Sequence, residues 1–155
     1  MAILLTQRQK INAIDMKPLL WKLRRTHWQL TDSDLLMIET EYRRFLILCQ
    51  KYPDAKLSPT RNMDKIWHEH ILDTKNYFKD CESIFGKYLH HRPYFGPYSG
   101  DTVWNEMDAN HDLLYELYLA EFGEKPKEDC EIFIEIGMKR SYCSEDCDKS
   151  CYQDQ

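Results

Sequence analysis

Apolar residues recur every three or four positions along this chain, and that spacing is typical of amphipathic helices. The clearest stretch runs from Leu35 to Cys49 and stops at Tyr52-Pro53. Only five glycines and six prolines interrupt the 155 residues. We therefore predict an all-α fold, a compact bundle of about five helices.

Polar residues at the expected helix starts divide the chain further. Asp32 or Asp34 is the expected N-cap of the clearest helix, and Asp101 the N-cap of a long helix that stops at Gly123. Ser58-Pro-Thr60 and Asp73-Thr74 are expected to supply the caps of two successive shorter helices. Because these two helices follow each other directly, the sequence predicts a helical corner near residue 73.

The length of the chain matches a single domain, which usually has roughly 100–150 residues. We predict one helical domain over residues 1–139 and a polar, cysteine-rich tail over residues 140–155. Residues 131–136 alternate between polar and apolar, which favours a short strand or an apolar extension of the core.

The tail carries Cys143, Cys147 and Cys151, four residues apart, so a helical tail would place them on one stripe. Three thiols could bind a metal ion if Cys130 or a second chain completed the site. The stripe could also engage a protein partner, or the tail could hold no metal and be flexible. The neighbouring Glu145 argues against a reactive thiolate, since a negative charge raises a thiol pKa.

The charge pattern excludes some classes of partner. A net charge of −5 disfavours nucleic acid, which usually needs a large basic face. The basic and aromatic stretch from Lys17 to Trp28 is the local exception, and it also fits the solvated side of a helix. No export signal and no stretch of roughly 20 apolar residues is visible. We therefore expect a cytoplasmic protein that does not enter a membrane.

Four of the six histidines lie between positions 68 and 91, together with several acidic residues and a cysteine. Neutral imidazole binds zinc, iron, copper or nickel, and three protein ligands with an open fourth position are typical of catalytic zinc. This stretch contains no His-Glu-x-x-His motif, and the chain has no glycine-rich phosphate loop and no Gly-x-Ser-x-Gly elbow. The missing motifs therefore disfavour a metalloprotease and exclude most of the common enzyme classes.

Helical spacing restricts which histidines can converge. Asp64 and His68 are four residues apart and share a face, whereas His68 and His70 point roughly 200° away from each other. Both histidines can reach one ion only if the helix breaks before Asp73. Otherwise one of the two histidines is structural and holds the corner together by hydrogen bonds.

His90 and His91 precede Pro93, so one of them could turn toward the corner. His111 is a further candidate, although its apolar helical neighbours also fit a buried histidine with a hydrogen-bond partner. One hypothesis is a divalent transition metal, zinc or iron, held by His68, His70 and His91 with Asp64 or His111, with hydrolytic or oxidative chemistry. The alternative is an interaction or regulatory module with structural histidines and a partner-binding tail.

The stretch Met63-Asp-Lys-Ile-Trp-His-Glu-His-Ile-Leu-Asp73, followed by Tyr77, Asp80-Cys81 and Phe85 to Gly96, resembles the glycine-rich-domain-containing-protein-like family, in its small bacterial type with a cysteine-bearing tail. This resemblance implies that His68, His70 and His91 are motif histidines. It also implies a set of companions: Asp64, Trp67, Tyr77, Asp80 and Cys81. It implies no particular activity.

Overall fold

A computed structural model of the chain describes residues 5–92, 101–127, 129 and 130. These residues form six helices and no strand, which confirms the all-α prediction with one helix more than expected. In chain order the helices are α1 (Gln7–Asn12), α2 (Lys17–Thr26), α3 (Asp32–Lys51), α4 (Arg61–Leu72), α5 (Thr74–Phe85) and α6 (Asp101–Phe122). The predicted strand at 131–136 and the cysteine-rich tail lie outside the described residues.

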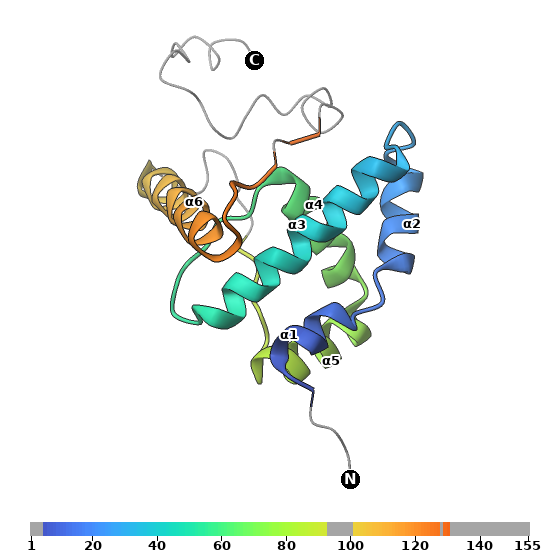
Figure 1. The fold of residues 1–155 in the computed structure, drawn as a ribbon, viewed down its shortest axis with the longest axis horizontal. Coiled ribbons are helices and arrows are strands. Elements are labelled where there is room, and N and C mark those ends of the chain that lie inside the picture. The colour runs from blue at the N-terminus through green and yellow to red at the C-terminus, as the bar shows by residue number, and fades with distance from the viewer. Residues whose placement is uncertain (1–4, 93–100, 128, 131–155) are drawn as a thin grey trace.

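Helix α3 runs across the middle of the molecule and contacts α1, α2, α4 and α6 (Figure 1). Its N-cap is Thr31, whose hydroxyl accepts from the backbone N–H of Asp34 while the Asp34 carboxylate accepts from the N–H of Thr31. This reciprocal capping box corrects the prediction of Asp32 or Asp34 as the cap. The hydroxyl of Thr31 satisfies a first-turn N–H group, and Asp34 becomes the third helical residue.

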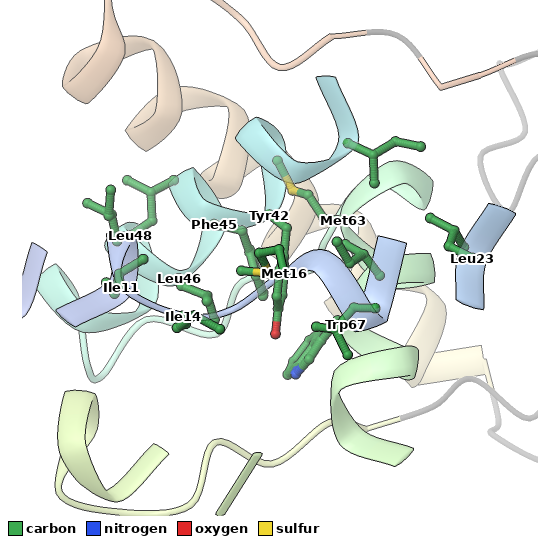
Figure 2. Packing of buried hydrophobic residues seen from close by; sticks show 14 of the residues in the cluster. Ile11, Ile14, Met16, Leu23, Tyr42, Phe45, Leu46, Leu48, Met63 and Trp67 are labelled. Carbon is green, nitrogen blue, oxygen red and sulfur yellow. The ribbon is translucent and has the colours of Figure 1, made fainter. Parts of the chain in front are cut away.

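Side chains from all six described helices pack together to form the core, part of which Figure 2 shows from close by. The labelled members are Ile11, Ile14, Met16, Leu23, Tyr42, Phe45, Leu46, Leu48, Met63 and Trp67. The rings of Phe45 and Trp67 lie 5.0 Å apart between centroids. Burying one such large apolar side chain stabilises the fold by about 1.5–3 kcal/mol. This packing fixes α4 against α3 and so decides which face of α4 is buried.

Helix α6 is fastened to α3 by a polar contact as well as by Leu114 and Tyr118, which are both buried. The hydroxyl of Tyr118 donates to the carboxylate of Glu41 at 2.6 Å and accepts from Arg44 at 2.9 Å. Burial raises the pKa of Glu41, although its hydrogen bonds and Arg44 act in the other direction.

None of the described helices has the length and apolar content that crossing a bilayer requires.

The predicted helical corner is present, because Asp73 alone separates α4 from α5. Thr60 caps α4 as expected, with its hydroxyl accepting from the N–H of Met63. Helix α5 ends at Gly86, which has φ of 65° in the left-handed region that glycine adopts without strain. Beyond this turn the chain returns toward α4, which brings His91 against that helix.

Candidate metal centre

Three side chains that can bind a metal ion converge beside α4. Asp64 and His68 lie one helical turn apart on the same face, and His91 comes from the segment that follows Gly86. The distances are 2.8 Å from Asp64 Oδ1 to His91 Nε2, 3.4 Å from Asp64 Oδ1 to His68 Nε2, and 3.2 Å between the two Nε2 atoms. Two histidines and one carboxylate therefore direct their ligand atoms to one point.

The spacing of these atoms fits the size of a metal ion. Ligand atoms about 2.0–2.1 Å from zinc lie about 2.8–3.0 Å apart in octahedral coordination and about 3.3–3.4 Å apart in tetrahedral coordination. All three observed separations fall within the span of about 2.8 to 3.4 Å that these two geometries cover. The side chains of His91, Asp64 and His68 are 14%, 31% and 47% exposed. The group is thus open to solvent on the side of His68.

The ring of His91 is held between two aromatic neighbours. It meets the indole of Trp67 edge to face, with centroids 4.6 Å apart, and the ring of His68 at 4.7 Å. Trp67 is only 4% exposed and belongs to the core. His91 therefore packs on a buried side chain, although the segment that contains it is not helical.

His70 lies elsewhere, because α4 continues regularly through Leu72 and the spacing of two residues turns its ring away from His68. The His70 residue is 3% exposed, with Nδ1 at 2.9 Å from the hydroxyl of Tyr42 and Nε2 at 3.1 Å from the carboxylate of Asp80. In the neutral ring Nε2–H donates to Asp80 and Nδ1 accepts from Tyr42. Burial lowers the pKa of His70, while Asp80 raises it.

The structure does not bring His111 to the group either. It lies on α6, where its ring packs against Tyr115 at 4.5 Å and burial lowers its pKa. Among the described residues, Asp64, His68 and His91 are the group of side chains with metal-binding geometry.

Two cysteines of the described chain are unsuited to thiolate chemistry, since burial raises the pKa of Cys81 and brings that of Cys49 to about 12. The tail cysteines lie outside the described residues, so a partner for the tail stays a prediction.

Sequence reasoning found the region but gave His68 and His70 equal weight. The four-residue spacing of Asp64 and His68 is the sequence signal that could have ranked this pair above the other candidate metal ligands. No sequence signal identified Tyr42 as a partner of His70, because it comes from α3, 28 residues earlier in the chain. Its contact depends on how α3 and α4 pack.

Fold and site together define an all-α protein with a two-histidine, one-carboxylate group at a helical corner. The family model UCP032817-like matches residues 6–96, more than half of the chain, and the chain belongs to this family. The matched segment contains Asp64, His68 and His91, and it ends before α6. No curated protein and no solved structure matches the chain.

The family match also corrects the resemblance to the glycine-rich-domain-containing-protein-like family, which was wrong. That resemblance depended on the stretch from Met63 to Asp73 together with Tyr77, Asp80-Cys81 and Phe85 to Gly96. The description UCP032817-like names no activity.

Proposed function

We propose that this protein binds one divalent transition-metal ion through Asp64, His68 and His91. The observation that carries the proposal is the convergence of three ligand atoms from two separate chain segments, all within 4.8 Å of one another. Imidazole and carboxylate ligands suit zinc and ferrous iron, and two histidines with one carboxylate are a common set for both.

A metal ion explains the arrangement better than hydrogen bonding alone. Each imidazole Nε2 either donates one hydrogen bond or accepts one. Here both Nε2 atoms approach the same Asp64 oxygen and lie 3.2 Å from each other, so at most one of the two can carry a proton without facing a second donor. A cation is a partner to which all three atoms can offer a lone pair at once.

Three protein ligands leave coordination positions for water or a substrate, which is the pattern of catalytic rather than structural zinc. The exposure of His68 keeps the approach from solvent open. A bound water of lowered pKa supports hydrolysis, and open positions on iron support oxidative chemistry. Metal binding is the first and testable part of this function.

The test uses full-length protein without a polyhistidine tag, in which Cys143, Cys147 and Cys151 are replaced by serine so that thiols cannot contribute. After removal of metal by a chelator, Zn²⁺ and Co²⁺ are titrated by calorimetry and visible spectroscopy. We expect one equivalent to bind. Since changes in outer partners alone cost about 10–100-fold in affinity, His68→Ala or His91→Ala should cost more than that.

The matched control is His90→Ala, because His90 is exposed, its ring packs on Tyr88, and it neighbours a proposed ligand. This variant should bind as the parent does. Binding of less than a tenth of an equivalent by the parent, or equal binding by His91→Ala and His90→Ala, would overturn the proposal.

A further inference from the structure

We infer that Tyr77 is a positioning residue for the metal centre: its hydroxyl anchors the Leu89 carbonyl and thereby decides that His91, and not His90, becomes the third ligand. This inference rests on the proposed function and names a residue that touches none of the three ligands. It concerns how the site is held ready for the ion.

The two halves of the site are constrained to different degrees. Asp64 and His68 are fixed by the backbone of α4, which packs on α3 and α5. His91 lies in residues 87–92, which form no helix or strand. Ordering such a residue costs about 1–2 kcal/mol of backbone entropy, so a separate contact must hold it if the site is to be preformed.

Tyr77 supplies that contact. Its hydroxyl donates to the carbonyl oxygen of Leu89 at 2.5 Å and accepts from the indole N–H of Trp67 at 2.8 Å. The Tyr77 residue is 1% exposed, and burial raises its pKa, which keeps the phenol protonated as a donor. The two hydrogen bonds tie the returning segment to Trp67, in the middle of α4.

The same indole is used twice. Its N–H bonds to Tyr77, and its ring is the wall against which His91 packs at 4.6 Å. Leu89 and His91 are therefore both placed relative to Trp67, one through Tyr77 and one directly. Figure 2 shows the indole nitrogen of Trp67 at the edge of the apolar cluster, turned away from the other labelled apolar side chains.

Anchoring at Leu89 also fixes the register of the two adjacent histidines. His91, two positions after Leu89, contacts Asp64 and His68. His90, one position after Leu89, is exposed and contacts Tyr88. Because these contacts lie one and two residues after the anchored carbonyl, a shift of one residue would exchange the two histidines.

The first test compares Tyr77→Phe, which removes only the hydroxyl, with Tyr88→Phe, a change on a neighbouring ring 5.1 Å away. Tyr77→Phe should lower Co²⁺ affinity about 10–100-fold and leave the spectrum at saturation unchanged, because the ligands are the same. Tyr88→Phe should stay within about twofold of the parent, below the effect of an outer partner. Amides 87–91 of the metal-free Tyr77→Phe protein should exchange hydrogen faster than those of the parent.

A second test does not alter the core. One glycine inserted between Leu89 and His90 moves His90 to the position two residues after the anchor. In that background we expect His90→Ala to abolish Co²⁺ binding and His91→Ala to leave it. If His91→Ala still abolishes binding, or if Tyr77→Phe changes neither affinity nor exchange, the inference is wrong. If the parent binds no metal, the proposed function fails, and the exchange of amides 87–91 still decides whether Tyr77 anchors the segment.

Discussion

Helix α4 contributes residues to two histidine–aspartate clusters that differ in their exposure to solvent and in the hydrogen bonds of their histidines. The open cluster consists of Asp64, His68 and His91, and the closed cluster consists of Tyr42, His70 and Asp80. The His68 side chain is 47% exposed, whereas the His70 side chain is 4% exposed. Two residues of helix thus separate a solvent-facing group from a buried one.

The decisive difference between the two clusters is whether the ring nitrogens of their histidines remain available to a metal ion. Both ring nitrogens of His70 have a protein partner, so no lone pair is left for an ion. In the open cluster the Nε2 atoms and the carboxylate oxygen converge on one another. Neighbouring histidines in a motif therefore need not share a role, and saturation of the ring nitrogens separates a structural histidine from a candidate ligand.

The largest expected effect is on the closed cluster. His70→Ala should lower the free energy of unfolding by about 2–4 kcal/mol, because it leaves a cavity and deprives the buried Tyr42 hydroxyl and the Asp80 carboxylate of their partner. Urea unfolding of the metal-free protein measures this loss. A change below about 1 kcal/mol would mean that the closed cluster does not hold the corner together.

The contrast between the clusters explains why the sequence predicted the fold better than the site. Three- and four-residue spacing indicated α3, α4 and α5, since each buries one mainly apolar face. Helix α1 was missed because six residues with a single buried side chain, Ile11, are too short for periodicity to appear. Local chemistry alone determined the helices that were found.

The site depended on contacts between distant residues. The divergence of His68 and His70 follows from helical geometry and was foreseen as one of two outcomes, but the choice needed the regular course of α4 up to Leu72. The partners of His70 come from α3 and α5, and the carbonyl that positions His91 belongs to Leu89. A backbone carbonyl leaves no signature in a sequence.

A smaller effect should appear with pH, again through the closed cluster. Burial depresses the pKa of His70 below its ordinary value of 6.5, so below that value the unfolded chain binds more protons than the folded one. Stability of the metal-free protein should therefore fall as the pH decreases from about 6.5, by at most about 1.4 kcal/mol per pH unit for each such histidine. His27 and His111 shift in the same direction.

Unfolding in urea at pH 7.5 and pH 5, with chelator present, measures this slope. His70→Gln, which has no titrating group but keeps one donor and one acceptor, should have a shallower slope than the parent. An unchanged slope in this variant would assign the pH dependence to other groups and remove His70 from the explanation.

The smallest expected effect is the one that tests the open cluster as a ligand group and not a structural tie. In the absence of metal, His68→Ala should change the free energy of unfolding by less than about 0.5 kcal/mol, as is usual for exposed positions. The side chain is half exposed, and its contacts with Asp64 and His91 are those within the open cluster. Removing it also removes the 3.2 Å contact between two Nε2 atoms, an exposed polar contact of a kind that contributes little to stability. A loss above about 1 kcal/mol in the metal-free protein would show that His68 holds the fold as His70 does, and the distinction between the two clusters would then have to be abandoned.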